Sequence, residues 1–384
     1  MLVAGEIAMR HAGRVAFTYT DEQRALRATT AGLMAKRSSE HQVRELMRTD
    51  TGHDPVVWQE LTDMGLPGLL IPEEMGGSGA GAVELGIVME EMGRALLCAP
   101  YLSTAVLAPN LLSAVDDAVE RENTLPRIAA GELIVGVAFA EGTSAWLPDH
   151  IETSGCISAG RWLLTGEKTF VLDALSADLL YVLAQTDAGP TVFAVERDTP
   201  GLEAEPLTTV DLTRKLGQVR FADTPARLIG SHGDGVAAMT TALDQSAVAL
   251  VSEQAGGTHR AMEMAAEYAK TRYQFGRAIG SFQAVKHMCA DMLLEAESAL
   301  SAARYVTSAF ADELPSRWAD LALAQAYCSD TFVTVAATNI QVHGGIGFTW
   351  EHPAHLYLRR ARCDAQLLGS PSVHRERYLH RIGA

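Results

Sequence analysis

Hydrophobic residues follow two different periods along the chain, and the period changes twice. From about residue 20 to residue 129 they recur at spacings of three and four, as in Val57–Met64 and Ala82–Leu97, which is typical of helices with one buried face. The tetrapeptide Thr20-Asp-Glu-Gln23 has the residues of a capping box and predicts the start of the first helix. The first third of the chain is therefore expected to be helical.

The middle of the chain, from about Glu132 to Ile229, has short apolar runs separated by turn residues. The turn Asp187-Ala-Gly-Pro190 lies between two of these runs. Short strands at this spacing predict a small β domain, either a barrel or a sandwich. The runs are Leu133–Phe139, Trp162–Thr165, Leu179–Leu183, Thr191–Val195 and Gln218–Phe221.

The last part of the chain returns to a helical pattern in three long segments, Ala237–Arg272, Ala284–Asp312 and Pro315–Val342. These segments are rich in Ala, Leu, Met and Glu, which favour helices, and their lengths suit a four-helix bundle. The predicted fold class is α+β. We expect an N-terminal helical domain over residues 17–130, a middle β-barrel domain over 131–230 and a C-terminal four-helix-bundle domain over 231–384.

Composition and charge narrow the possible functions. The chain has 384 residues, more than one hydrophobic core usually supports, and its 48% of hydrophobic residues can form packed cores. The net charge of -16 argues against non-specific binding to nucleic acid, which depends on clustered Lys and Arg. Any phosphate group must then be held by local donors, since the overall field repels it.

No segment of the sequence resembles a membrane span or a signal peptide. Charged residues interrupt the apolar residues of Met1–Ala16, and no run approaches about 18 consecutive apolar residues. The five cysteines are scattered without a C-x-x-C pair, which indicates neither a disulfide framework nor a zinc site. We therefore expect a cytoplasmic protein without a metal site.

Two places near the ends of predicted helices could meet a phosphate. Arg272 ends the first long helix, where it could pair bidentately with a phosphate or remain a solvated charge at a helix C-terminus. Gly344 and Gly345 follow another long helix, where bare backbone could approach a ligand or simply form a turn that ends the helix. Residue chemistry alone leaves both alternatives open.

The surrounding segments carry a resemblance to a known family. The segment Arg272-Tyr-Gln-Phe-Gly276, continued to Gln283, and the segment Gln341-Val-His-Gly-Gly-Ile-Gly-Phe348 resemble two motifs of the acyl-CoA dehydrogenases. Gly65–Gly79 and Gly166–Phe170 are similar to two further segments of that family. The order of helices, strands and helices also matches, so the resemblance extends over residues 17–381.

This resemblance implies an FAD cofactor bound between two subunits, an acyl-CoA thioester as substrate and electron-transfer flavoprotein as electron acceptor. In the family, one subunit's β domain holds the flavin ring, and the neighbour's C-terminal bundle holds the pyrophosphate and adenosine. The positions that match the adenosine-side contacts are Arg272, Gln274, Phe275, Gln283, Gln341, His343, Gly344 and Gly345.

The chain departs from the family where the chemistry takes place. The family's catalytic base is a glutamate at one of two positions, and these are Gly369 and Ser246 here. The strand threonine that donates a hydroxyl near the flavin is Leu172, which cannot make that hydrogen bond. The segment Ala140–Trp146 also lacks the family's ordered small hydroxyl residues. The catalytic residues of this chain are therefore unknown.

The residues that match the family's adenosine-side contacts are thus kept, while those that match the flavin-ring side are lost. This contrast indicates an FAD site that is divided between two different subunits. The chain resembles the base-lacking subunit of the α2β2 heterotetramers of actinobacterial steroid side-chain degradation, whose partner supplies the base. One alternative is a self-sufficient homotetrameric acyl-CoA or acyl-carrier-protein dehydrogenase with a displaced base, for which Asp244, Glu253 and Asp364 are candidates. Another alternative is a flavin-free scaffold or binding protein with the same fold.

Overall fold

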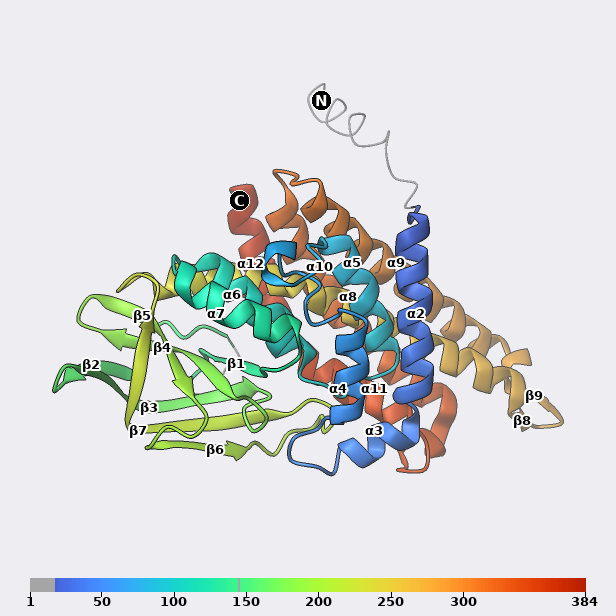
Figure 1. Ribbon diagram of the computed structural model, residues 1–384. Helices are drawn as coiled ribbons and strands as arrows, with labels where there is room; N and C mark the ends of the chain where they lie inside the picture. The colour runs from blue at the N-terminus through green and yellow to red at the C-terminus, as the bar shows by residue number, and fades with distance from the viewer. Residues whose placement is uncertain (1–17, 144–145) are drawn as a thin grey trace, which may run out of the picture.

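Helices, a seven-stranded sheet and further helices follow one another along the chain in the computed structural model, which describes residues 18–143 and 146–384. The strands gather at one end of the molecule, and the long helices extend away from them (Figure 1). This order confirms the predicted α+β class. The predicted start at residue 17 and the N-terminal segment Met1–Ala16 lie outside the described residues.

The N-terminal helices begin where the sequence predicts. The Thr20 hydroxyl accepts a hydrogen bond from Gln23 N at 3.2 Å, and Gln23 Oε1 accepts one from Thr20 N at 3.0 Å, so the capping box is present. The elements are α2 (Asp21–Arg37), α3 (Glu40–Leu46), α4 (Pro55–Asp63), η1 (Glu73–Met75), α5 (Ala82–Arg94), the π-helix η2 (Leu102–Leu107), α6 (Ala108–Ala114) and α7 (Ala118–Ala129).

The strands of the middle region close into a barrel. Five of them pair in a ring, β4–β2–β3–β7–β5–β4, while β1 adds to β4 in parallel and β6 adds to β7. The barrel, and not the sandwich, is the correct alternative. The strands are β1 (Val135–Ala138), β2 (Ser154–Ser158), β3 (Arg161–Leu172), β4 (Leu179–Thr186), β5 (Gly189–Glu196), β6 (Leu202–Pro206) and β7 (Leu216–Ile229).

The C-terminal region contains the three predicted long helices, with boundaries within two residues of the prediction. Helices α8, α9 and α10 pack against one another, and α12 packs against α10, which gives the predicted four-helix bundle. The elements are α8 (Gly235–Thr271), β8 (Tyr273–Gln274), β9 (Arg277–Ala278), η3 (Ile279–Ser281), α9 (Gln283–Ala311), α10 (Arg317–His343), η4 (Gly344–Phe348), α11 (Ala354–Asp364) and α12 (Pro371–Ile382).

The predicted domain limits near residues 130 and 230 fall in the connections between α7 and β1 and between β7 and α8. The division into three domains itself stays a prediction. Among the helices within residues 18–143 and 146–384, none has the length and apolarity needed to cross a membrane.

Helices α5 and α8 cross at two glycines. A Cβ atom on Gly93 would lie 2.1 Å from Glu253 O, and one on Gly256 would lie 2.0 Å from Glu90 O. The backbones therefore touch, which only glycine allows at such a crossing. This contact fixes the N-terminal helices against the longest helix of the bundle.

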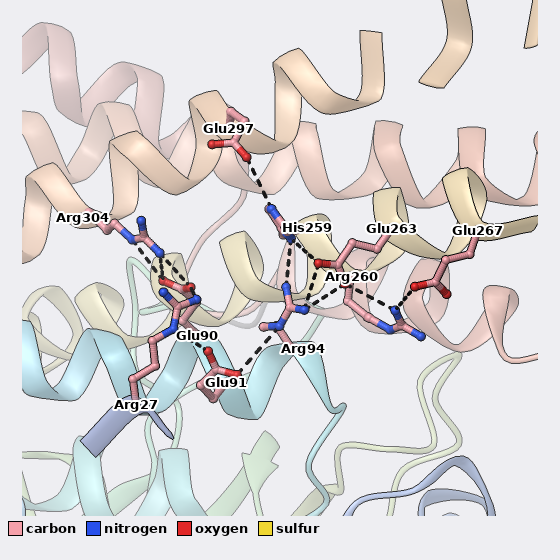
Figure 2. A network of polar contacts seen from close by, with 10 residues as sticks. All are labelled: Arg27, Glu90, Glu91, Arg94, His259, Arg260, Glu263, Glu267, Glu297 and Arg304. Carbon is pink, nitrogen blue, oxygen red and sulfur yellow. Dashed lines mark hydrogen bonds and ion pairs between the residues drawn. The ribbon is translucent and has the colours of Figure 1, made fainter. Parts of the chain in front are cut away.

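Polar contacts surround this crossing and join four helices (Figure 2). Glu90 and Glu91 of α5 are buried, and Arg27 of α2 contacts both carboxylates at 2.7 and 2.8 Å. Arg304 of α9 lies 3.0 Å from Glu90, and Arg94 of α5 reaches Glu263 of α8 at 2.8 Å. Each buried carboxylate thus has a cationic partner, without which its burial would be costly.

We expect Gly256→Ala to destabilise the protein, because its methyl group would overlap the α5 backbone and force the helices apart. The expected loss is about 1–3 kcal/mol, typical of overpacking, and a lower melting temperature in thermal unfolding would report it. The matched control is Gly32→Ala in exposed α2, where nothing lies within 4 Å of the new Cβ. That substitution should raise stability by roughly 0.5–1 kcal/mol. An unchanged melting temperature for Gly256→Ala would contradict the contact.

Candidate functional site

The segment predicted to bind the cofactor begins where α8 ends. The helix stops at Thr271, and Arg272 adopts an extended conformation while its N–H still donates to Tyr268 O at 2.8 Å. The hairpin β8–β9 follows, with Phe275 and Gly276 at its tip at φ +54° and +77°. Positive φ at both tip residues is typical of tight two-residue hairpins. This hairpin projects from the bundle at the end away from the barrel (Figure 1).

The second predicted segment is a turn with exposed backbone. Helix α10 ends at His343, and Gly344 adopts φ +66° and ψ −143°, a conformation essentially restricted to glycine. A Cβ atom on Gly344 or Gly345 would meet nothing within 4 Å. The backbone at this turn is therefore open to a ligand.

Seven of the eight predicted cofactor residues are exposed, and only His343 is buried. Within the described part of the chain, the side chains of Arg272, Gln283 and Gln341 make no hydrogen bond or ion pair with other protein groups. These groups are open to solvent: a guanidinium, two amides and a glycine turn without side chains. They suit a polar anionic ligand that is held against a second surface. The exposed residues are Arg272, Gln274, Phe275, Gln283, Gln341, Gly344 and Gly345.

The side chain of His343 faces the protein interior. Its ring lies between Tyr268 and His352, with centroid distances of 4.2 Å to each. Tyr268 belongs to the last turns of α8 and His343 ends α10, so this stack brings the two predicted segments together. His352 was not among the predicted site residues. It follows the second motif by only four residues, but nothing in its spacing indicates a stacked ring.

A separate cavity of about 430 Å³ lies where the barrel meets α11 and α12. Leu172, which replaces the family's threonine, is buried in the core and is not among the described residues that line the cavity. Its lining includes Trp146, Phe170, Leu216, Arg362, Leu367 and Val373. Residues 144–145 of the altered segment Ala140–Trp146 lie outside the described part of the chain.

Neither family position for the base can act as one. Gly369 has φ +108°, and a Cβ atom there would lie 2.9 Å from His374 Nε2 and 3.4 Å from Trp146 Cε3. The rings of Trp146 and His374, 6.2 Å apart, thus cover the space into which a side chain at 369 would extend. Ser246 is fully buried and accepts a hydrogen bond from Asn110 Nδ2 at 3.0 Å. This occlusion was not predicted.

The three carboxylates considered as displaced bases are held by arginines. Asp244 forms ion pairs with Arg377 and Arg381 of α12. Burial alone would raise the pKa of Glu253, but ion pairs with Arg214 and Arg360 outweigh it and hold that pKa below its ordinary value. Asp364 lies 3.3 Å from Arg214 without hydrogen-bond geometry. None of the three is among the described residues that line the cavity.

Arg360 is the centre of a buried charge cluster that joins three parts of the chain. Its guanidinium donates to Asp211 Oδ2 at 2.9 Å and to Thr213 Oγ1 at 2.7 Å, both in the connection from β6 to β7. It also pairs with Glu253 of α8 and reaches Leu97 O, just beyond α5. The cluster lies directly behind the cavity, because Asp211 also lines the cavity.

Comparison with known proteins now identifies the family. The N-terminal domain of acyl-CoA dehydrogenases matches residues 20–132, and their C-terminal domain matches residues 233–383. This chain belongs to the acyl-CoA dehydrogenase family. The family consists of FAD-dependent flavoproteins, and its members are oxidoreductases that act on CH–CH bonds.

Several relatives are similar over nearly the whole chain. Acyl-CoA dehydrogenase IpdE2 of Mycobacterium tuberculosis is 35% identical over 355 residues, 92% of this chain and 95% of its own. FadE27 of the same organism is 32% identical, over 90% of this chain and 91% of its own. The steroid acyl-CoA dehydrogenase Tcur3481–Tcur3483 superposes with a TM-score of 0.84 at 28% identity, covering 94% and 98% of the two chains. The ChsE4–ChsE5 complex from Mycobacterium tuberculosis gives 0.86 at 27% identity, covering 96% and 99%.

Asp364 leads to a prediction about stability and pH. Burial raises the pKa of its carboxyl from the ordinary value of 3.8 to about 7. Above pH 3.8 the unfolded chain therefore releases a proton that the folded chain keeps, so this group lowers stability progressively as pH rises to about 7. Asp364→Asn should remove the effect and raise the melting temperature at pH 8 by roughly 2–5 °C.

The same variant should have a much smaller effect at pH 4, because the folded carboxyl is protonated there and the pH lies close to the unfolded-state pKa of 3.8. The control is Asp330→Asn, because Asp330 forms an exposed ion pair on α10 and such pairs contribute little to stability. Equal shifts for Asp364→Asn at pH 4 and pH 8 would contradict the raised pKa.

Proposed function

We propose that this chain is the non-base subunit of a heteromeric acyl-CoA dehydrogenase. It would provide the part of an FAD site that binds the adenosine and pyrophosphate, and a partner subunit of the same fold would provide the rest of the site. The observation that carries the proposal is the contrast between the two ends of the chain. The residues around Arg272 are open and free for a ligand, whereas Trp146 and His374 cover the base position at Gly369.

The two ends lie far apart along α8. The cavity lies at the level of Glu253 along α8, because Asp211 and Glu253 share Arg360. Arg272 follows 19 residues later, about 28 Å along a helix axis. This separation supports a ring site outside this chain's own cavity for FAD held at Arg272. A partner's β domain would supply that ring site.

The residues of this chain would bind and orient the cofactor. When bound, FAD supplies the hydride acceptor for the α,β-dehydrogenation of an acyl-CoA thioester. Arg272 would pair with the pyrophosphate, and the N–H groups at Gly344 and Gly345 would donate to it. The amides of Gln283 and Gln341 would contact the nucleotide part. The base that removes the α-proton would belong to the partner.

The relatives support a proposal for the substrate class. Tcur3481–Tcur3483 is a steroid acyl-CoA dehydrogenase, and ChsE4–ChsE5 is a complex of two different chains. We therefore propose a bulky, ring-containing acyl-CoA of steroid side-chain degradation as the substrate, with electron-transfer flavoprotein as the electron acceptor. A homotetramer with a displaced base receives less support, because arginines hold Asp244 and Glu253.

The visible absorption spectrum of the purified protein tests the division of the site. We expect no flavin band near 450 nm from the chain alone. We expect about one FAD per pair of chains when this chain is co-expressed with a second family member. The second member to use is one that has the base glutamate and whose gene lies next to the gene for this chain. Arg272→Gln should release most of the FAD from that complex, while the control Arg48→Gln, in the exposed turn after α3, should leave it bound. One FAD per chain in the lone protein would contradict the proposal, and no FAD in the complex would favour a flavin-free scaffold.

We also expect that restoring a glutamate at position 369 does not create an active lone chain. The new side chain would overlap His374 and Trp146 on a backbone at φ +108°. Gly369→Glu should show no dehydrogenase activity with a dye acceptor and should lower stability by roughly 2–4 kcal/mol. The control Gly160→Glu has a similar positive φ of +76° but open space around it, so it isolates backbone strain. Turnover by lone Gly369→Glu protein would contradict the occlusion.

A further inference from the structure

Three aromatic rings form a bent stack beside the proposed FAD half-site, with the outer rings of Tyr268 and His352 6.4 Å apart and steeply inclined to each other. The ring of His343 lies 4.2 Å from that of Tyr268, tilted by 31°, and 4.2 Å from that of His352, tilted by 43°. The three residues come from different elements. Tyr268 lies near the end of α8, His343 is the last residue of α10, and His352 lies between η4 and α11.

Hydrogen bonds assign the protons of the two imidazoles. His343 Nδ1 lies 2.8 Å from Asn339 O, a group that can only accept, so Nδ1 carries the proton. His352 Nδ1 accepts a hydrogen bond from Ala354 N at 3.2 Å, so this nitrogen carries none. Both contacts suit neutral rings. Burial lowers the pKa of His343. Burial also lowers the pKa of His352, and the neighbouring His343 lowers it further.

The stack connects the two segments that would meet FAD. The carbonyl of Tyr268 accepts the hydrogen bond from Arg272 N at 2.8 Å, and His343 directly precedes Gly344. The rings therefore set the distance between the cationic group and the glycine turn. These two groups must contact the same pyrophosphate if the proposed function holds.

We infer that Tyr268, His343 and His352 are positioning residues for the FAD half-site, and that protonation of the histidine stack releases FAD as the pH falls. This inference rests on the proposed function and concerns the regulation of the same site. Protonated His352 could no longer accept the hydrogen bond from Ala354 N, and it would bring a positive charge to the N-terminus of α11, where a cation is unfavourable.

The charged groups around the stack also oppose protonation. His352 faces Glu40 and Arg44 of α3, as well as His343. His355 of α11 is buried against Trp350, faces His352, Arg44, Arg359 and Glu40, and has a pKa lowered to about 4 by its burial. Glu40 is the one carboxylate among these groups, opposed by two arginines. Two cationic rings 4.2 Å apart would therefore repel each other with little compensation.

The test measures FAD binding to the co-expressed complex between pH 8 and pH 5.5, from the fluorescence of released flavin. For the native complex we expect the FAD dissociation constant to rise up to about fivefold from pH 7.5 to pH 5.5, the effect of one pKa unit of linkage on a group whose pKa lies below 6.5. His352→Phe keeps an aromatic ring but cannot titrate. It should bind FAD within about threefold of the native complex at pH 7.5 and lose most of the pH dependence.

Two further variants separate positioning from general damage. His352→Ala removes the ring and should weaken FAD binding about tenfold at pH 7.5, since the ring contact is lost at every pH. His41→Phe, on the exposed surface of α3, should keep the native affinity and the native pH profile. His352→Phe should therefore rescue much of what His352→Ala loses.

The outcomes distinguish this inference from the proposal on which it rests. FAD bound at pH 8, with the same pH profile in the native complex and in His352→Phe, would overturn the inference and leave the divided site intact. Tighter binding at pH 5.5 would overturn it as well, because simple attraction between imidazolium and phosphate would then dominate. No FAD in the complex at any pH would overturn both.

Discussion

Arg360 lies where all three parts of the chain meet, and its hydrogen bonds hold them together. It binds Asp211 and Thr213 beside the barrel, Glu253 on α8 and the carbonyl of Leu97 after α5. A guanidinium suits this position because it is planar, always charged and carries five donors. Removing one partner from such a buried pair typically costs about 3–5 kcal/mol, because a charge is left without compensation. The arrangement of helices and barrel therefore depends on this side chain.

Different chemical groups would be needed at the two ends of α8. At the barrel end, flavin chemistry would need a hydroxyl donor and a base at the two positions expected from the family. Hydroxyl groups of Thr143, Thr208, Thr209 and Ser370 line the cavity, but those two positions carry neither group. Leu172 lies in the core, Gly369 carries no side chain, and Trp146 and His374 occupy the adjoining space. At the far end, binding a dinucleotide needs only bare backbone, amides and one arginine at the surface. A subunit can lose the first set and keep the second, because the sets share no residue.

The sequence predicted the features that depend on neighbouring residues. The capping box at Thr20 and the lengths of α8, α9 and α10 follow from local chemistry and periodicity, and they are confirmed. Strands β2 and β6 were missed because nearly all their residues are exposed and carry no apolar run.

The contacts that assemble the site were not predictable in the same way. Arg360 reaches groups 107 to 263 residues away, and no local pattern encodes such partners. His343 was expected among the cofactor contacts because the motif contains it, but its ring points inward. A motif fixes the order of residues along a turn, while packing against Tyr268 and His352 decides which side of the turn each side chain takes.

Helix α8 links these observations, because it is the element that both ends of the molecule share. Its N-terminal half carries Asp244 and Glu253, which arginines hold, and its C-terminus carries Tyr268 and Arg272. Gly256 packs against α5, Arg94 of α5 pairs with Glu263, and Glu297 of α9 lies 3.4 Å from His259, so polar contacts hold α8 to both α5 and α9 (Figure 2). A helix held this firmly cannot shift to bring a displaced base into the cavity. The same rigidity keeps Arg272 at a constant position, which a surface shared with a partner requires. The buried charges that hold Asp244 and Glu253 are thus also the contacts that would make this chain an effective half of a shared site.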